Sequence, residues 1–98
     1  MNMQQLMQQA QRMQRDIQNK KSEIERMTFT GKSEWIEIEF DGNKNIKKLS
    51  ILKDEVIDSD DKEMLEDMLM IAIKDAFKQI DKVTEEKLGS YASMSGLI

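Results

Sequence analysis

The sequence contains no cysteine and no histidine among its 98 residues. Their absence excludes disulfide bonds, thiolate or imidazole metal sites, and catalysis by a cysteine or histidine side chain. A chain of this length buries only about two thirds of the surface that its unfolded form exposes. Small domains without cross-links or metals are often completed by a partner subunit. We therefore expect a single domain over residues 1–98 that forms a homodimer.

Long apolar stretches are also missing. No run approaches the roughly 18 residues of a membrane span, and the glutamine-rich start is too polar for a secretory signal. The sequence has no phosphate-binding loop, no dinucleotide-binding glycine pattern, and no nucleophile paired with a base. We expect a cytoplasmic, non-enzymatic protein with no cofactor, no metal, no membrane partner and no small-molecule substrate.

Charge is unevenly distributed along the chain. The net charge is −4, yet residues 1–33 hold six basic against three acidic side chains. Residues 58–98 hold five basic against ten acidic side chains. Such an asymmetry indicates that the first third of the chain has an electrostatic role of its own.

The first third has the pattern of one long helix. Apolar side chains recur at alternating spacings of three and four, as the a and d positions of a heptad do, with Lys20 at one d position. We expect a helix over residues 3–26, about 36 Å long. The apolar positions are Met3, Leu6, Ala10, Met13, Ile17, Ile24 and Met27.

The middle third has the period of a strand. Ile36, Ile38 and Phe40 alternate with glutamates, and Asp41-Gly42 supplies residues that tolerate a tight hairpin turn. We expect a three-stranded antiparallel sheet within residues 27–52, with one face covered by the helices. The first expected strand is Met27–Thr30, closed by Gly31, and the second is the segment that ends at Phe40. The third is Ile46–Ile51, with Leu49 and Ile51 pointing inward.

The last third predicts a second long helix over residues 59–88. Ser59 or Asp60 can cap its start, and the acidic side chains in its first turn suit the helix dipole. Lys87 and Gly89 are stop signals, so residues 89–98 are expected to form a flexible tail.

Inside that helix, the run "MLMIAI" over residues 68–73 points apolar side chains in every direction. One face can cover the sheet, and the opposite face is most simply covered by another copy of the chain. The alternative is a wide stripe that a monomer buries. The expected dimer interface contains Met68, Leu69, Met70, Ile71 and Ile73.

One face of the first helix carries arginine and amide side chains. At 100° per residue they fall within a stripe about 80° wide, opposite the apolar face and free of acids. Arginine and amide groups donate hydrogen bonds to phosphate oxygens, and no base-reading motif is present. The stripe favours contacts to a nucleic-acid backbone, although a merely solvated face has the same pattern. Its residues are Gln8, Arg12, Arg15, Asn19, Ser22 and Arg26.

Three lysines also share one face of the second helix, at positions 74, 78 and 82. Acidic side chains are mixed in with them, which is typical of surface ion pairs four residues apart.

The order of these elements resembles the bacterial YbaB/EbfC family of small nucleoid-associated proteins over nearly the whole chain. The segments that carry the resemblance are "LMQQAQRMQRDIQ", "FDGNKNIKKLSI" and "DKEMLEDMLMIAIKDA". The resemblance implies an α+β fold of αβββα order, a homodimer with projecting helices, and binding of double-stranded DNA in the nucleoid. By position, it implies DNA contacts from Arg12, Arg15, Arg26, Lys20, Lys21, Lys78 and Lys82.

The competing hypothesis is a protein-interaction adaptor that binds no nucleic acid. Its methionine-rich first helix would dock on a partner helix, with Lys20 setting the register. RNA binding is a third possibility.

Overall fold

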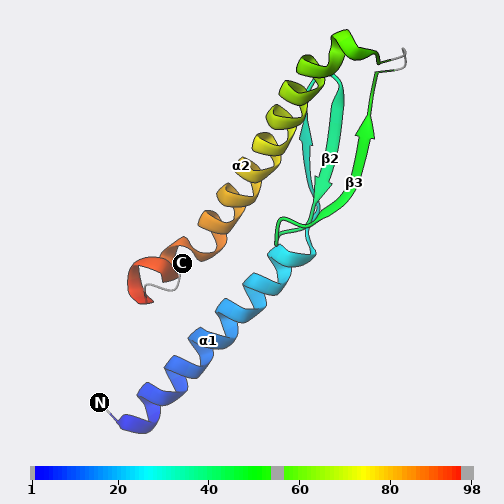
Figure 1. Ribbon diagram of the computed structural model, residues 1–98. Helices are drawn as coiled ribbons and strands as arrows, with labels where there is room; N and C mark the ends of the chain where they lie inside the picture. Colours follow the sequence, from blue (N-terminus) through cyan, green and yellow to red (C-terminus); the bar gives the residue numbers. More distant parts are fainter. Residues whose placement is uncertain (1, 54–56, 96–98) are drawn as a thin grey trace.

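A computed structural model of the protein describes residues 2–53 and 57–95, with side chains described as far as Tyr91. The elements in chain order are α1 (Met3–Arg26), β1 (Phe29–Lys32), β2 (Ile36–Phe40), β3 (Ile46–Ile51), the 3₁₀ turn η1 (Ser59–Asp61) and α2 (Lys62–Ser95). This order confirms the predicted α+β class. In Figure 1, α2 lies along one face of the sheet, while α1 leaves the end of the sheet and projects away from it. The molecule is therefore elongated, measuring 70 × 20 × 15 Å.

The helix α1 has the predicted bounds, and only its second half packs against the rest of the chain. The side chain of Asn2 caps its start by accepting a hydrogen bond of 2.9 Å from the Gln4 backbone N–H. Ile17 and Ile24 are buried, whereas residues 2–12 are all exposed. The first half of α1 is thus an arm that extends beyond the body of the protein.

The sheet is antiparallel with strand order β1-β2-β3, and the core lies between α2 and the strands β1 and β2. Ile36, Ile38 and Phe40 alternate inward as predicted and are almost completely buried. The ring of Phe40 meets that of Phe77 of α2 edge to face, with the ring centres 5.0 Å apart. Burial of these side chains stabilises the fold together with the rest of the apolar core.

The first strand differs from the expected Met27–Thr30, because Gly31 lies inside β1 rather than closing it. Gly31 is opposite Ile38 of β2 and directly beneath α2. A Cβ atom at this position would lie 1.9 Å from the carbonyl oxygen of Ala72 and 2.8 Å from the Cβ of Ala76. The missing side chain, with two alanines above it, lets the helix backbone approach the strand closely.

The turn between β2 and β3 is organised by Asp41, in the place that the sequence predicted. Its carboxylate accepts hydrogen bonds from the backbone N–H groups of Asn43, at 2.8 Å, and Asn45, at 3.0 Å. These bonds, led by that of Asn45, lower the pKa of Asp41. The turn also touches the end of α1, where the Gly42 N–H donates to the Glu25 carbonyl at 3.4 Å.

Among the described residues none covers the strand β3, contrary to the expectation that Leu49 and Ile51 point into a core. They pair with Ile38 and Ile36, so all four lie on the side of the sheet that faces α2. Leu49 and Ile51 nevertheless remain 51% and 52% exposed. Within the described residues, α2 packs on β1 and β2 but not on β3. A helix about 10 Å wide does not span three strands about 4.8 Å apart when it lies over the first two.

Both ends of the second helical region differ from expectation. The N-cap is Asp58, rather than Ser59 or Asp60, and its carboxylate accepts a hydrogen bond of 2.9 Å from the Asp60 N–H. At the other end α2 continues through Gly89 to Ser95, so the expected tail is helical as far as that residue. Leu88 is buried and Tyr91 is hydrogen-bonded to α1, and this packing overrides the low helix propensity of glycine. The remaining tail, residues 96–98, lies outside the described residues.

Replacing Gly31 by alanine is expected to lower the free energy of unfolding by about 2 kcal/mol or more, because the new methyl group overlaps the α2 backbone. Urea unfolding followed by circular dichroism measures the change. The matched control is Gly89→Ala, whose Cβ would meet only the flexible carboxylate of Glu85, at 2.9 Å. That control is expected to be neutral or stabilising, by up to about 1 kcal/mol. Equal stability of Gly31→Ala and the wild type would contradict the close approach.

Candidate nucleic-acid interface

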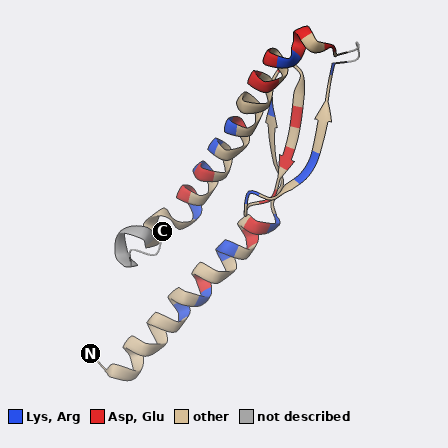
Figure 2. Cartoon of the chain, in the orientation of Figure 1, with Lys and Arg blue, Asp and Glu red and all other residues tan. Residues whose placement is uncertain are grey.

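The predicted arginine stripe runs along the exposed face of α1. Arg12, Arg15 and Arg26 are all exposed, and about 21 Å of helix separates the first from the last. Among the described side chains, none of the three forms an ion pair. Arg26 donates from Nε to the Ser22 carbonyl at 3.2 Å, a contact within its own helix that leaves the remaining donors of its guanidinium for another partner. Figure 2 shows basic residues, in blue, spaced along α1.

The other polar residues of the stripe share this orientation. Gln8 and Asn19 are exposed, and Ser22 is half-buried. The stripe therefore presents guanidinium and amide donors together, and the apolar side of α1 turns toward α2 through Ile17 and Ile24. A helix with this arrangement can follow a row of phosphate oxygens without burying a charge.

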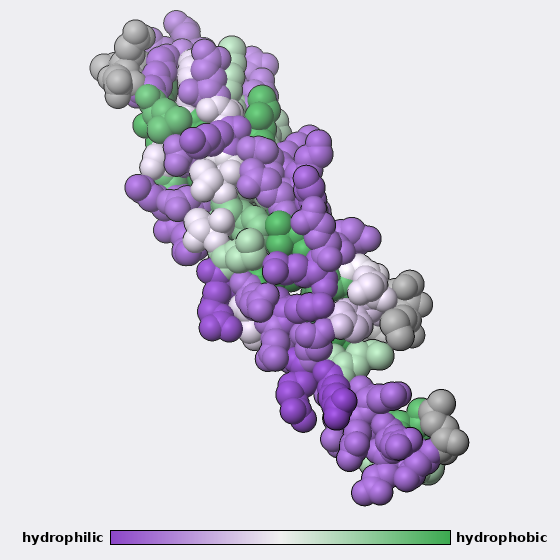
Figure 3. All heavy atoms as spheres, turned by 180° about the vertical axis from the view of Figure 1, so that it is seen from behind, coloured by the Kyte–Doolittle hydropathy of each residue, from purple (hydrophilic) through white to green (hydrophobic). Residues whose placement is uncertain are grey.

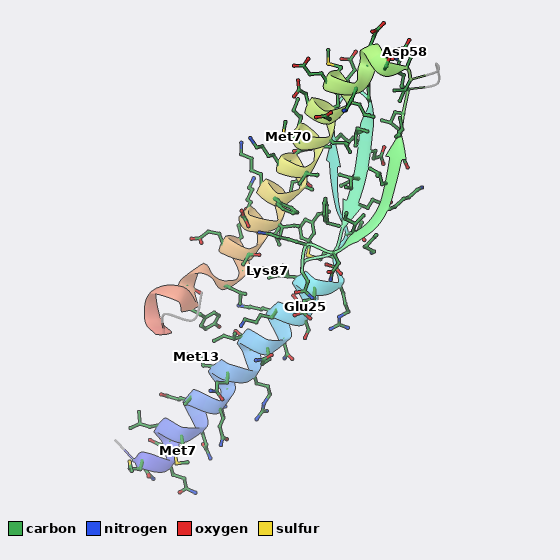
Figure 4. The ribbon with its side chains drawn as sticks, viewed as in Figure 1. Met7, Met13, Glu25, Asp58, Met70 and Lys87 are labelled. Atoms are coloured by element: carbon green, nitrogen blue, oxygen red, sulfur yellow. The ribbon has the colours of Figure 1, made fainter. Side chains whose placement is uncertain are left out.

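Two acidic side chains at the margin of the stripe are held by other contacts. The hydroxyl of Tyr91, near the end of α2, donates a hydrogen bond to the carboxylate of Asp16. Lys20 forms an ion pair with the same carboxylate at 3.3 Å. Further along α1, Lys87 of α2 pairs with Glu23 at 3.3 Å, between the two helices that approach each other in Figure 4. The negative charges next to the arginines are thus balanced from within the chain.

The titration behaviour of this cluster follows from its hydrogen bonds. The Tyr91 hydroxyl, followed by Lys20, lowers the pKa of Asp16 below its usual range. The same hydrogen bond raises the pKa of Tyr91, and the Asp16 carboxylate raises that of Lys20. Asp16 is therefore ionised and Lys20 protonated at neutral pH.

Two of the predicted DNA-binding residues do not join the arginine stripe. Lys20 is engaged with Asp16, and its ammonium lies 5.0 Å from the centre of the Tyr91 ring. Lys21 is half-buried on another side of α1, where it lines a shallow hollow of about 330 Å³ together with Asn43, Thr84 and Leu88. Helical spacing already places both lysines outside the arginine stripe, whereas the contact of Lys20 with Tyr91 depends on where α2 packs and is not visible in the sequence.

The predicted lysines of α2 lie on a surface of mixed charge. Lys78 and Lys82 are exposed and border a shallow groove together with Asp75 and Asp81. Asp81 in turn pairs with Lys44 of the hairpin turn at 3.6 Å. Among the described side chains, Lys74, Lys78 and Lys82 form none of the ion pairs four residues apart that the sequence indicated, and the row is an exposed face of mixed charge.

The two edges of the sheet differ in whether other side chains bond to their backbone groups. Along β1, side chains of α2 satisfy backbone groups of the outer edge: Asp75 accepts from the Lys32 N–H at 3.0 Å, and Gln79 donates to the Thr30 carbonyl at 2.9 Å. The edge of β3 has no such cover among the described residues. Exposed edges with an apolar face are the usual places for a second chain to pair or pack.

The sequence reasoning missed β3 as an apolar surface. The exposed apolar residues of β3 continue just beyond the end of the strand. A single helix is narrower than a three-stranded sheet, and comparing the two widths would have predicted that one strand stays uncovered. Figure 3, which shows the molecule from behind, has apolar surface gathered over the sheet-bearing half and a mainly hydrophilic projecting α1. The exposed apolar residues on β3 and just beyond it are Ile46, Leu49, Ile51 and Leu52.

The five residues predicted for a dimer interface divide into two groups. Met68, Leu69 and Ile73 are half-buried and pack against the chain's own core. Met70 and Ile71 are exposed. By helical spacing, Met70 lies on the flank of α2 that also carries Phe77, the flank turned toward the β2–β3 hairpin.

The described residues contain no helix with the length and apolar character that crossing a membrane requires. They form a small α+β chain with a projecting basic helix and one uncovered strand. The YbaB/EbfC DNA-binding family model matches residues 1–95 of this chain. The protein belongs to this family.

Relatives in three bacteria are each named nucleoid-associated proteins. A nucleoid-associated protein of Lactococcus lactis subsp. lactis is 47% identical over 93 residues, which cover 93% of each chain. One from Streptococcus uberis is 40% identical over 94% of each chain. One from Lactobacillus delbrueckii subsp. bulgaricus is 41% identical over 93% of this chain and 84% of the relative.

A crystal structure of an uncharacterised protein from Helicobacter pylori has the same fold. Its TM-score to this chain is 0.72, with 22% sequence identity, 97% of this chain covered and 99% of the other.

The lowered pKa of Asp16 predicts how its contribution to stability depends on pH. The folded chain favours the carboxylate, so the stabilisation is complete above about pH 4 and is lost as the pH falls through the lower pKa of the folded state. We expect the wild type to exceed Asp16→Asn in free energy of unfolding at neutral pH, and the difference to shrink in acid. Urea unfolding of both chains across this range measures it, and the other aspartates cancel in the comparison. A difference independent of pH would show that the Asp16 contacts do not form in solution.

Proposed function

We propose that this chain is a non-enzymatic nucleoid-associated protein that binds double-stranded DNA as a homodimer. The observation that carries the proposal is the row of exposed arginines on α1, none of them ion-paired within the described residues. Membership of a DNA-binding family and relatives named as nucleoid-associated proteins support it. The proposed location is the nucleoid, within the cytoplasm.

The overall negative charge does not prevent such binding, because the charges are separated along the molecule. The densest acidic cluster lies at the start of α2, and Figure 2 shows it at the opposite end from the projecting α1. The molecule is 70 Å long, whereas charges in water are screened over about 8 Å at physiological salt. The arginine stripe therefore acts on a phosphate backbone with little opposition from that cluster.

The proposed contacts are to phosphates rather than to bases. Arginine pairs bidentately with phosphate oxygens, and such contacts carry no sequence information directly. Binding of this kind releases counterions and weakens steeply as salt increases. We infer weak sequence preference, with Arg12, Arg15 and Arg26 as the main contacts and Lys78 and Lys82 as flanking ones.

The proposed dimer uses the surface that one chain leaves uncovered. Leu49 and Ile51 of β3, together with Met70 on the adjoining flank of α2, form an exposed apolar surface next to an open strand edge. The opposite edge is occupied by Asp75 and Gln79, so β3 is the strand available for a symmetric partner. A dimer of this kind would double the arginine stripe.

Replacing Arg12, Arg15 and Arg26 by alanine is expected to weaken binding to every short duplex by a similar factor. The slope of log affinity against log salt should fall by about 0.9 for each phosphate that the variant no longer contacts. Fluorescence anisotropy between low and moderate salt measures both quantities. The control is Lys32, Lys62 and Lys74 to alanine, which removes the same charge from positions away from the stripe. Equal weakening by both triple variants would reduce the effect to net charge, and wild-type chain that ignores DNA at low salt would refute the proposal.

The variant Leu49→Glu is expected to convert the dimer to a monomer, because it places a charge in the apolar interface. Sedimentation velocity of wild type and variant measures the change. Lys48→Glu is the control. Lys48 is exposed and adjacent to Leu49 on β3, and it lies opposite Glu39 of β2 in the strand register, on the other face of the sheet. A monomeric wild type, or a Leu49→Glu chain that stays dimeric, would contradict the assigned surface.

The adaptor hypothesis retains one specific observation in its favour. The apolar a and d positions of α1 continue onto the projecting arm, where Met3 and Leu6 are 77% and 45% exposed. A partner helix could pack on these positions. A pull-down after nuclease treatment separates the two functions, since a stoichiometric protein partner that survives nuclease favours the adaptor.

A further inference from the structure

We propose that Tyr91 is a positioning residue for DNA binding, which fixes the direction of the projecting half of α1 and therefore the placement of Arg12 and Arg15. This inference rests on the proposed function. The effect of Tyr91 is exerted through Asp16, to which its hydroxyl donates a hydrogen bond.

One anchor fixes the C-terminal end of α1. The backbone becomes extended at Met27, and β1 begins at Phe29, so the chain can pivot between helix and strand. The β2–β3 turn presses on this end of the helix: a Cβ atom at Gly42 would lie 2.2 Å from the carbonyl oxygen of Ile24. A single anchor at one end fixes where α1 starts from but not the direction in which it points.

The second anchor lies around Asp16, whose carboxylate accepts the hydrogen bond from Tyr91 and whose neighbour Ile17 is buried in the core. Asp16 lies ten residues before the end of α1, about 15 Å along its axis, and Tyr91 lies on α2, which is held down on the sheet. Lys20 completes the contact by pairing with Asp16 and lying over the Tyr91 ring, at 3.3 Å and 5.0 Å. Two anchors separated by nearly three helical turns define a direction.

The ion pair between the helices contributes less to this direction. Lys87 and Glu23 are both solvent-accessible, and exposed pairs of this kind stabilise weakly. Glu23 is also closer to the pivot than Asp16 is, so it restrains the angle of α1 over a shorter lever. The hydrogen bond from Tyr91 therefore acts further out along α1 than the bond from Lys87 does.

The consequence for binding follows from the position of the arginines. Arg15 is adjacent to Asp16 and Arg12 is one turn further out, whereas Arg26 lies at the anchored end. Loosening the second anchor swings the whole helix about its C-terminal end, so Arg12 and Arg15 move further than Arg26 relative to the flanking lysines of α2 and to the arginines of a second chain. If only a fraction of the molecules hold α1 in the binding direction, the apparent affinity falls by that fraction while the bound state is unchanged.

The variant Tyr91→Phe tests this without altering any charge. We expect its affinity for a 20-base-pair duplex to fall about threefold to tenfold, and its salt slope to equal that of the wild type, since the same phosphates are contacted once bound. The matched control is Thr84→Val, which also removes one hydroxyl from α2; that hydroxyl donates within its own helix, to the Ile80 carbonyl at 2.8 Å. The control should bind as the wild type does.

A second measurement reports the direction of α1 itself. The chain has no cysteine, so Gln5→Cys and Glu86→Cys, both at exposed positions, can carry a pair of spin labels. Labelled chain is diluted with unlabelled chain, so that distances are measured within one molecule. We expect Tyr91→Phe to broaden the distance distribution in the absence of DNA, and duplex DNA to narrow it again.

Each outcome decides between the proposals. If the wild type binds DNA and Tyr91→Phe matches it in affinity, the positioning role is wrong, whether or not the distances broaden. A salt slope that falls together with the affinity would mean that the variant contacts fewer phosphates once bound, and would also overturn the positioning role. If the wild type binds no duplex, the DNA-binding function fails and the positioning role fails with it, even where the distances show that Tyr91 holds α1.

Discussion

The close approach of α2 to the sheet at Gly31 is the constraint on which the rest of the structure depends. With Ala72 and Ala76 above a glycine, the helix axis lies over β1 and β2, and Ile36 and Ile38 are buried beneath it. This placement has two consequences at a distance. Within the described part of the chain it leaves β3 without a cover, because one helix is too narrow for three strands. It also aims the far end of α2 at the middle of α1, where Leu88 is buried and Tyr91 reaches Asp16.

The elongated shape allows one small chain to be acidic overall and basic along one helix. In a compact domain with the same net charge of −4, the acidic and basic surfaces would lie closer together and be less well separated by screening. Here the acidic start of α2 and the arginine stripe occupy opposite ends of a 70 Å molecule. The acids nearest the stripe, Asp16 and Glu23, are neutralised by Lys20 and Lys87. The contacts of these acids with α2 also join the helices, so local charge balance and the orientation of α1 have a common origin.

The sequence predicts those features that depend on local periodicity. The bounds of α1 and the inward positions of β2 follow from heptad spacing and strict alternation, and both are confirmed. The expected ends of the first strand at Gly31 and of the second helix at Gly89 are wrong, because glycine is a stop signal only where tertiary packing does not decide. The exposed arginine face is visible in the sequence, since it requires only the helical period. The engagement of Lys20 by Tyr91 is not, because it joins residues 71 positions apart and depends on where α2 ends.

The two proposed features of function are coupled through geometry. If β3 pairs two chains, the distance between their arginine stripes is fixed at one end by the dimer interface and at the other by the angle at which each α1 leaves its sheet. Two stripes on one duplex gain from effective concentration only when both can engage at once, and a mismatch of angle removes that gain. A weak contact per chain therefore suffices for useful affinity, provided that α1 is rigid. The contact between Asp16 and Tyr91 supplies rigidity at the point where an arm of otherwise exposed helix leaves the body of the protein.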